Sequence, residues 1–466
     1  MFKKNTKHQQ LSLFGFETQL SSIKKKKLEN SKESYFYKMI FSKINEEDFS
    51  VLYSSKSSRP NAPINTLVSS IILLNQKGWT TEELFNNIDF NLLTRSALGL
   101  DTFEQTPFCP ATYFNFQNRL LNHYKETGEN LLEKVFDKLT GKQLKSLKIK
   151  TNIQRTDSFM ALSNIQNYTR VQLLVEMLIR LYRVLNENDK NEFNKLIKPY
   201  IGQTAQNFLY TLAKESIPKE LEKLGKIYNI LCKKLNATYG DEEIFQIFKR
   251  VSTEHFREEI SGLKVKKNNE LKSNSLQSPD DVDATYRNKS GKKNKGQSIN
   301  VTETINPENK INLITDVSVH SNNIDDSKIL NKRIEIINDK TPDLEELHTD
   351  GAYGSSDNDK KLEELGITQI QTAVRGTSSK VKIEIEKNTN ESDEYTVSCP
   401  NQKVISTPTK KRHQACFNKK ICNSCTLAQD CPAIEQKKCR CYYFKTEAYM
   451  LGKRNKNIDL LKIRVK

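Results

Sequence analysis

The stretch "LKIKTNIQRTDSFMA", residues 147–161, decides which fold the rest of the chain is expected to adopt. Apolar Ile149 and Ile153 alternate with polar neighbours, and an alternation with a period of two predicts a β-strand. The strand is expected to deliver Asp157 at its end. Residues that follow must therefore supply the neighbouring strands of a sheet.

A second acid stands in a similar setting in "HTDGAYGS", residues 348–355. Asp350 follows a strand-like approach, and Gly351 and Ala352 come directly after it. A surface turn explains this pattern, but an active-site acid explains it better, because Asp157 has a matching context. The small residues would leave room for a nucleic-acid backbone, and Tyr353 is expected to pack beneath the strand rather than contact a sugar.

Two carboxylates a few ångströms apart repel each other, and a bound Mg²⁺ removes that repulsion. Two-metal centres of this kind hold the attacking and leaving oxygens of an in-line displacement at phosphorus, with water or a DNA 3′-hydroxyl as nucleophile. Asp157 and Asp350 are therefore predicted to bind metal. Asp316, in "LITDV", is a rival acid, but it lies within a strand and is predicted to be structural.

At 466 residues the chain exceeds the roughly 250 to 300 residues at which single cores stop growing, so two or three domains are expected. It carries 74 Lys and Arg against 57 Asp and Glu, a net charge of +17. This excess favours a polyanionic partner, and DNA is the leading candidate. The alternative is a Lys-rich composition without a binding role.

No segment approaches the roughly 20 apolar residues of a membrane span, and the polar start "MFKKNTKHQQ" does not resemble a signal peptide. The sequence therefore predicts an intracellular, cytoplasmic protein. Seven of the nine cysteines lie between Cys399 and Cys441. In a reducing compartment such cysteines are expected to be thiols or metal ligands rather than disulfides.

Helical spacing dominates residues 34–148, which are expected to form an all-α domain after a basic, flexible tail over residues 1–33. The helix that begins near "CPATYFNFQNRLL" offers three polar side chains to DNA in the manner of a helix-turn-helix. They are Asn115, Asn118 and Arg119. An ordinary packed helical core is an equally acceptable interpretation.

Strand and helix patterns alternate in the remainder, which predicts an α/β (α+β) catalytic core with a mixed sheet, formed by residues 149–164 and 265–466. Residues 165–264 return to amphipathic helices and are expected to be a helical insertion. After the insertion come a hairpin, a helix, a strand that ends at Asp350, another helix and a further strand.

Four motifs in this order resemble the DDE transposases of bacterial insertion sequences, in the group with a helical N-terminal domain, a helical insertion and a cysteine cluster. They are "RTDS" (155–158), "SPDDVDATYRNKSGKKNKGQSINVTET" (278–304), "LITDVSVHSNNIDD" (313–326) and "LHTDGAYGS" (347–355). The resemblance extends over most of the chain from about residue 35.

The resemblance implies an RNase H-like catalytic core, with Asp157 and Asp350 as the first and second acids and Mg²⁺ or Mn²⁺ as cofactor. It implies cleavage and joining of DNA at transposon ends, a bacterial, nucleoid-associated location, and leaves a homodimer open as the assembly. It also implies a role near DNA for Arg287 and Lys289, for which phosphate contact is the physical interpretation. Solvated loop charge is the alternative for these two residues.

The family's third acid normally lies on a helix after the cysteine cluster, in the pattern Tyr, two residues, Arg, three residues, Glu. Tyr449 is followed at the Arg position by Gly452, so the pattern does not occur here. The chain is therefore expected to be a shortened or frame-shifted copy with impaired catalysis, and Glu447 is the only substitute considered. Loosely held metals would slow phosphoryl transfer, because that chemistry depends on positioning.

The cysteine-rich segment, residues 395–441, predicts a structural zinc site. Cys422 and Cys425 form a CxxC, which lets two thiolates face one tetrahedral Zn²⁺. Cys399 and Cys431 would complete the set of four ligands. The remaining cysteines of the segment, Cys416, Cys439 and Cys441, receive no assigned role.

Three functions compete on this sequence. The first is an enzyme of DNA strand transfer, and the second is a non-catalytic DNA-binding remnant of such an enzyme. The third is a metal-dependent nuclease, which gives no reason for the N-terminal helical domain. The two acids indicate that the chain descends from an enzyme of DNA strand transfer. The missing glutamate favours a present role as a non-catalytic DNA-binding protein.

Overall fold

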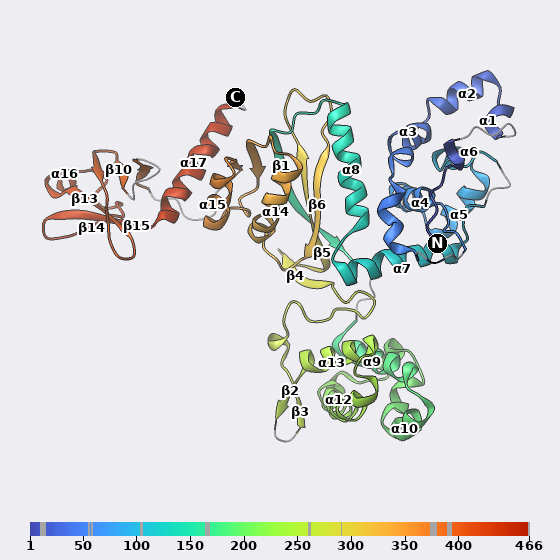
Figure 1. The fold of residues 1–466 in the computed structure, drawn as a ribbon. Helices are drawn as coiled ribbons and strands as arrows, with labels where there is room; N and C mark the ends of the chain where they lie inside the picture. The colour runs from blue at the N-terminus through green and yellow to red at the C-terminus, as the bar shows by residue number, and fades with distance from the viewer. Residues whose placement is uncertain are drawn as a thin grey trace. The chain divides into compact units, whose positions relative to one another are not determined.

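The computed structural model describes residues 1–9, 15–54, 56, 59–102, 106–163, 168–259, 262–289, 291–372, 380–388 and 394–464, the last seven of these by backbone only. The mixed α/β fold expected from the sequence is confirmed (Figure 1). The chain divides into two compact units. Unit 1 is Met1–Lys150 with Asn309–Thr315, and unit 2 is Thr151–Glu308 with Asp316–Lys466. Within the described residues, no helix is both long enough and apolar enough to cross a bilayer.

Unit 1 is helical and has its own core of buried apolar side chains, which includes Phe41, Phe49, Ile64 and Val68. Its α-helices are α1 (Phe16–Gln19), α2 (Ser22–Glu29), α3 (Lys32–Met39), α4 (Ile64–Lys77), α5 (Thr81–Phe90), α6 (Leu92–Ala97), α7 (Pro110–Thr127) and α8 (Leu131–Ser146). Short 3-10 turns, η1 (Lys7–Gln9), η2 (Phe41–Lys43) and η3 (Glu46–Leu52), connect or precede them.

The expected flexible tail over residues 1–33 is a point at which the structure differs from the sequence prediction. Helix α2 begins at the cap Ser21 and carries Leu28, which is buried, as is Phe16 of α1. The backbone N–H of Asn5 donates to the Glu46 carboxylate at 2.6 Å. The Lys run that suggested a tail is the solvated face of a short helix, whose apolar residue packs inward.

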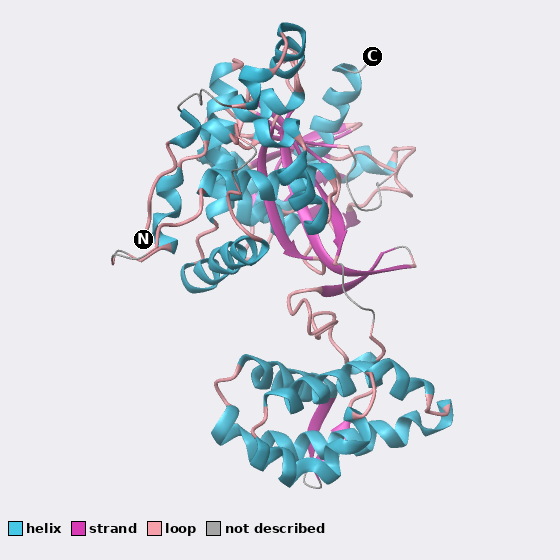
Figure 2. Ribbon diagram, turned by 90° about the vertical axis from the view of Figure 1, so that its right-hand side faces the viewer, coloured by secondary structure: helices cyan, strands magenta, loops and turns pink. Residues whose placement is uncertain are grey.

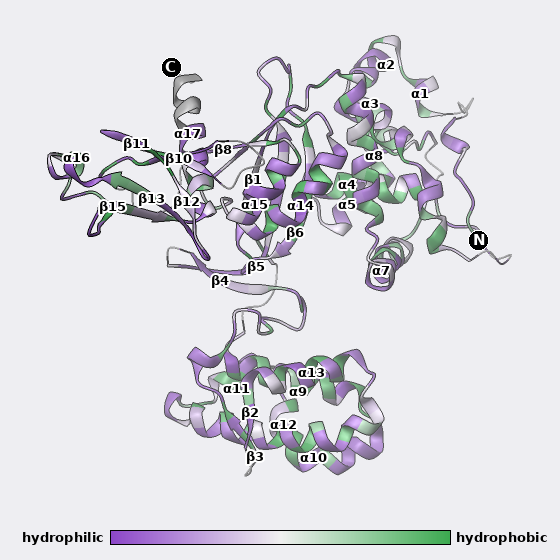
Figure 3. Cartoon of the chain, turned by 60° about the vertical axis from the view of Figure 1, so that its left-hand side comes forward, coloured by the Kyte–Doolittle hydropathy of each residue, from purple (hydrophilic) through white to green (hydrophobic). Residues whose placement is uncertain are grey.

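The helical insertion expected over residues 165–264 is helical, although its expected boundary falls on residues 164–167, outside the described residues. Its helices are α9 (Arg170–Val184), α10 (Glu187–Ile201), α11 (Ala205–Tyr210), α12 (Ile217–Tyr239) and α13 (Glu243–His255), with the turn η4 (Lys214–Ser216). Hydrophobic and hydrophilic residues alternate along these helices (Figure 3), and the apolar residues form one buried cluster.

A small antiparallel hairpin, β2 (Phe256–Glu259) and β3 (Gly262–Val265), ends the insertion and lies among its helices (Figure 2). The hairpin was not predicted from the sequence, because half of its residues are charged and lack a clear strand pattern. Phe256 fixes it in place: the ring is buried and lies 5.6 Å from that of Tyr228, centroid to centroid.

A mixed sheet carries the two acids. Its strands are β1 (Ile153–Leu162), β4 (Thr285–Lys289), β5 (Lys292–Thr304), β6 (Ile314–Ser321), β7 (Glu346–Thr349) and β8 (Thr368–Gln371). They are hydrogen-bonded in the order β4-β5-β1-β7-β8, and β6 also pairs with β5. Strand β1 is antiparallel to β5 and parallel to β7, and β7 is parallel to β8. The 3-10 turn η5 (Asn268–Glu270) precedes β4.

Two helices connect the parallel strands, α14 (Asp326–Lys340) before β7 and α15 (Ser356–Glu364) before β8. Buried side chains of α14, β7 and α15, among them Ile334, Leu347 and Leu362, form a core with Tyr353. Gly296 has a φ of 147°. A Cβ there would collide with the Ala161 carbonyl of β1, so a glycine is required where β5 pairs with both β1 and β4.

The cysteine-rich end forms two small sheets and a terminal helix. One sheet has the order β11-β10-β9 and the other β12-β13-β15-β14. The elements are β9 (Glu384–Lys387), β10 (Tyr395–Cys399), β11 (Gln402–Ile405), β12 (Thr407–Pro408), β13 (His413–Asn418), α16 (Lys419–Asn423), β14 (Ile434–Glu435), β15 (Cys439–Phe444) and α17 (Thr446–Arg464). Tyr395, Val397, Phe417 and Phe444 lie in their common core.

A pH dependence of stability is expected from His255 in the insertion. Burial, and then the charges of Arg170 and Lys266, lower the pKa of His255 to about 3. An unfolded histidine has a pKa of about 6.5. Below that pH the unfolded chain binds a proton that the folded chain does not, so the free energy of unfolding falls as pH falls from 6.5 toward 3.

The substitution His255→Gln removes this titration and keeps an acceptor for Arg170 Nε, which donates to His255 Nδ1 at 3.1 Å. Between about pH 7.5 and about pH 5, wild type should lose about 2 kcal/mol more of its free energy of unfolding than the variant. Urea unfolding of the full chain at both pH values measures the difference. Equal losses in the two proteins would contradict the assignment.

Candidate functional site

The parallel pairing of β1 with β7 brings Asp157 and Asp350 to the same level of the sheet. Ile153 pairs with Glu346, and the register runs on to Arg155 opposite His348. Two further residues along both strands lead to Asp157 and Asp350, both of which are exposed. Paired positions on parallel strands point to the same face. The structure therefore brings together the two acids that the sequence analysis selected.

The expectation that β1 ends at Asp157 is wrong, because the strand continues to Leu162. Beyond Asp157, β1 remains paired with β5, so Ser158 lies opposite Asn300. Asp350, by contrast, follows the last residue of β7. One acid thus lies in mid-strand and the other at a strand end, and the site opens where β7 stops.

A network of buried polar side chains is hydrogen-bonded to the backbone around Asp157 and joins it to the loop that carries Asp350. The Tyr353 hydroxyl lies 2.7 Å from Ser158 Oγ and accepts from Asn300 Nδ2 at 2.8 Å. Asn300 Nδ2 also lies 3.3 Å from the Asp157 carbonyl oxygen, and Thr156 Oγ1 donates to Asn300 Oδ1 at 3.1 Å. Tyr353 is fully buried, as predicted. The network links β1, β5 and the loop after β7, so it fixes the backbone that carries both carboxylates.

Asp326, the first residue of α14, is a third acid at this place. Burial raises the pKa of Asp326, and the charge of Asp350 raises it further, against a hydrogen bond with Ser158. Burial, and then the charges of Asp326, Asp157 and Asp350, raise the pKa of Tyr353. All three carboxylates therefore lie close enough to Tyr353 to act on its hydroxyl.

Asp326 is not among the acids selected from the sequence, and the neighbouring Asp325 occupies the N-cap position of α14. The sequence held one signal for a further role of Asp326. Two acids are adjacent at the start of the helix, and a single acid is enough to cap it. The sequence did not reveal that the start of α14 lies beside β1, because that contact depends on the crossover from β6 to β7.

Arg287 and Lys289 lie on β4, near the same acids, since their charges lower the pKa of Asp326. Lys289 is exposed. Arg287 Nη1 donates to the carbonyl oxygens of Asn322 and Ile324, at 2.9 and 3.3 Å. Arg287 therefore braces the turn that leads into α14, and Lys289 is the side chain of the pair that is presented to solvent.

Asp316 is structural, as predicted. It is fully buried on β6, and its carboxylate accepts from Arg333 Nε at 3.1 Å and from Lys340 Nζ at 2.9 Å. The acid thus ties β6 to two turns of α14. Its charge is compensated within the fold, whereas Asp157 and Asp350 face solvent.

The three predicted DNA-contacting residues of α7 lie on one face of the helix, at positions 115, 118 and 119. All three are exposed. The Arg119 guanidinium stacks on the Tyr53 ring at 4.9 Å, and this contact holds its position. Residues 98–109 separate α7 from α6, so α7 is not preceded by the three- or four-residue turn of a compact helix-turn-helix.

The four cysteines predicted as zinc ligands, Cys399, Cys422, Cys425 and Cys431, line one cavity of about 20 Å³. Space of this size holds about one water molecule or ion. Burial raises the pKa of Cys422, and the neighbouring Cys399 and Cys431 raise it further. Gln402 donates to Cys422 Sγ at 3.3 Å and Asn401 to Cys425 Sγ at 3.2 Å. The fold thus places these four cysteines around one small cavity.

The tightest set of sulfurs consists of the other three cysteines. Cys416, Cys439 and Cys441 have ligand atoms that all lie within 4.8 Å of one another, and among the described residues no other group of three or more His, Cys, Asp or Glu does so. The four cysteines predicted as zinc ligands surround a cavity, but their sulfurs do not approach one another as closely as those of the other three cysteines. Cys416, Cys439 and Cys441 are therefore the group that could hold a metal ion.

Burial, and then hydrogen bonds with the Cys441 and Cys439 thiols, raise the pKa of Cys416 to about 12. Burial also opposes ionisation of Cys441, but hydrogen bonds from Cys416, Cys439 and Gln414 outweigh it and lower the pKa of Cys441. The hydrogen bonds among these thiols therefore favour the ionised form of Cys441 and disfavour that of Cys416.

Glu447 is exposed in the first turn of α17. The part of α17 that reaches the sheet comes later: Asn457 Nδ2 donates to the Gln369 carbonyl of β8 at 3.0 Å. Arg454 approaches Gly354 so closely that a Cβ there would collide with the guanidinium. Glu447 precedes Asn457 by ten positions, or about 15 Å of helix. Among the described side chains of α17, the one that is hydrogen-bonded to β8 is therefore an asparagine.

Stability measurements should separate the structural acid from the candidate site. Asp316→Ala leaves Arg333 and Lys340 without their buried partner and should lower the free energy of unfolding by roughly 3 kcal/mol or more. Asp157→Asn and Asp350→Asn remove exposed charges and should change it by about 0.5 kcal/mol or less. Urea unfolding measures all three. A large loss in either asparagine variant would show that the acid holds the fold together.

No family model, no curated protein and no solved structure gives a significant match to this chain. A functional assignment therefore depends on the positions of the chain's own side chains. Those positions consist of three carboxylates around Tyr353, basic residues on β4 and two separate groups of cysteines.

Proposed function

We propose that the chain is a DDE-type transposase of an insertion sequence, with an RNase H-like core that cleaves and joins DNA in a metal-dependent reaction. The strand order supports this proposal. Without β4, the strand order across the sheet is β6-β5-β1-β7-β8. Strands β7 and β8 run parallel to β1. An RNase H-like core has this arrangement, with its acids on the first strand and after the fourth.

The observation that carries the proposal is the placement of Asp157 on β1 level with Asp350, which directly follows the parallel strand β7, with Asp326 near Asp350. Burial raises the pKa of Asp326, and the charge of Asp350 raises it further, so these two carboxylates repel each other. The hard oxygen atoms of these acids fit Mg²⁺ or Mn²⁺. A bound cation would favour the ionised form of Asp326. When bound, such ions stabilise charge on the attacking and leaving oxygens of the phosphodiester.

The chain's own groups would position the reaction. The hydrogen bonds of Tyr353, Ser158 and Asn300 hold the backbone beneath the acids rigid. A water or a 3′-hydroxyl forms a bond to phosphorus and releases its proton to solvent. The bond from phosphorus to the 3′-oxygen breaks, and the leaving oxygen takes a proton from solvent. Lys289 offers a cation to a neighbouring phosphate.

A second candidate function is a non-catalytic DNA-binding protein. The observation that favours it is on α17, where Asn457 rather than an acid contacts β8 and Glu447 lies about 15 Å away along the helix. If none of the side chains of α17 that the structure describes supplies a third ligand, cations would be held weakly. Under this alternative the protein retains its DNA partner and its nucleoid location, with a homodimer as the assembly, and loses the chemistry.

DNA cleavage decides between these functions. The full chain is incubated with DNA that carries the sequences flanking its coding region, in Mg²⁺ or Mn²⁺. We expect cleavage by wild type, and a loss of roughly 100-fold or more in Asp157→Ala and Asp350→Ala, because each removes a ligand that positions phosphorus. Asp357→Ala, an exposed acid on α15, is the matched control and should cleave like wild type.

Activity that survives either site substitution would refute the acid site. A wild-type chain that binds the DNA but never cleaves it would establish the second candidate function instead.

The salt dependence of DNA binding tests the role of Lys289. Each Lys that neutralises a phosphate adds about 0.9 to the slope of log K against log salt. We therefore expect Lys289→Gln to reduce this slope by about 1, and Lys233→Gln, an exposed lysine on α12, to leave it unchanged. Fluorescence anisotropy over a salt series measures both. Identical slopes in all three proteins would show that Lys289 does not contact a phosphate of the bound DNA.

A further inference from the structure

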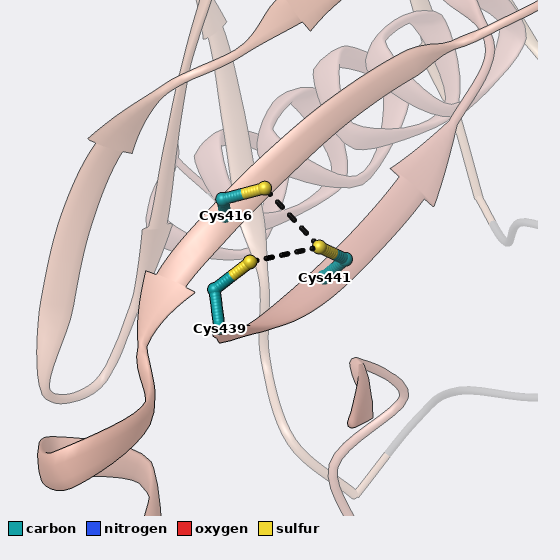
Figure 4. Close-up of side chains that lie close together, drawn as sticks. All are labelled: Cys416, Cys439 and Cys441. Atoms are coloured by element: carbon teal, nitrogen blue, oxygen red, sulfur yellow. Dashed lines mark hydrogen bonds between the residues drawn. The ribbon is translucent and has the colours of Figure 1, made fainter. Parts of the chain in front are cut away.

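The sheet β12-β13-β15-β14 carries three thiols that the predicted zinc site does not use. Cys416 on β13 lies directly opposite Cys441 on β15 in the antiparallel register. Cys439 precedes Cys441 by two positions on the same strand. Alternate residues of a strand, and residues that face each other across two strands, project from the same face. All three thiols therefore emerge on one side of this sheet (Figure 4).

The three sulfurs converge on one another. Cys441 Sγ lies 3.1 Å from Cys416 Sγ and 3.3 Å from Cys439 Sγ, the two contacts drawn in Figure 4. Their exposure is graded, since Cys441 is 1% exposed, Cys439 is half-buried and Cys416 is exposed. In this group, Cys441 is therefore inaccessible to solvent and Cys416 is accessible.

Gln414 adds a polar group to the same face. Its amide nitrogen lies 3.0 Å from Cys416 Sγ and 3.1 Å from Cys441 Sγ. The side chain therefore stands over two of the sulfurs. An amide donor of this kind stabilises negative charge on thiolates, as groups outside the ligand shell do in metal sites.

We propose that Cys416, Cys439 and Cys441 form a separate metal site that binds one thiophilic d¹⁰ cation, with Zn²⁺ as the reference ion, through three thiolates. Three thiol S–H bonds break, three sulfur–metal bonds form, and three protons pass to solvent, so the zinc complex carries one negative charge. Soft thiolates select Zn²⁺ or Cu⁺ over Mg²⁺. Three protein ligands leave the fourth position of a tetrahedral ion for water or a small ligand.

This site is distinct from the cavity of Cys399, Cys422, Cys425 and Cys431. That cavity lies between the β10–β11 hairpin and α16 and includes none of the three thiols. A closed four-thiolate site holds its ion in the interior, whereas the three-thiolate site opens to solvent at Cys416. The two sites should therefore exchange zinc at different rates, and the exposed site should lose its ion first to a chelator.

Metal content of the full chain tests the proposal. Protein purified under reducing conditions is saturated with Zn²⁺, and excess metal is removed. We expect about two zinc ions per chain in wild type, and loss of about half of the zinc both in Cys416→Ser/Cys439→Ser and in Cys422→Ser/Cys425→Ser. Cys109→Ser, which changes an exposed cysteine on the N-terminal side of α7, is the matched control and should keep the full content.

Alkylation mapping of wild type avoids any dependence on variant folding. Mass spectrometry should find Cys416 and Cys439 protected by Zn²⁺ and reactive after chelation, while Cys109 reacts in both states. Unprotected Cys416 in the zinc-loaded chain would overturn the proposal. A disulfide between Cys416 and Cys441 that persists in the presence of reductant would also overturn it, because these sulfurs could then not bind the ion as thiolates.

Discussion

The parallel register between β1 and β7 is the constraint on which the candidate site depends. Asp157 and Asp350 are separated by the whole insertion, the hairpin strands and α14, and they share a level only because Ile153 pairs with Glu346. A slip by one residue would turn one acid to the opposite face, since side chains alternate along a strand. The register is therefore a functional as well as a structural property.

The hydrogen bonds beneath the acids protect that register. Asn300 and Tyr353 join the two antiparallel strands to the loop after β7 through buried polar groups. Such groups are costly to leave unpaired in an apolar interior. A shifted pairing would break several of these bonds together, so the network selects one alignment of three segments. Asp316 acts similarly on the other side of α14, where its buried charge holds the helix against β6.

The cysteine-rich end illustrates how two metal-binding patterns can share one short segment. The CxxC spacing marks Cys422 and Cys425 because local backbone geometry alone can bring their sulfurs together. Cys416 and Cys441 have no such local mark. They meet through strand pairing, and Cys439 joins them through the two-residue period of β15. The pair Cys422 and Cys425 can thus be recognised from the local sequence, whereas Cys416, Cys439 and Cys441 come together only through the pairing of β13 with β15.

The sequence by itself determined the strands and helices of the core, the place of the helical insertion and the selection of Asp157 and Asp350, because periodicity and strand-end acids are local signals. It misjudged residues 1–33 and the end of β1, since burial of Phe16 and Leu28 and the pairing of Ser158 with Asn300 involve distant partners. Only the tertiary structure decided that Asp326 joins the acids, that Arg287 braces a turn and that Cys416, Cys439 and Cys441 converge. Each depends on contacts between residues remote in the chain, which local patterns do not specify.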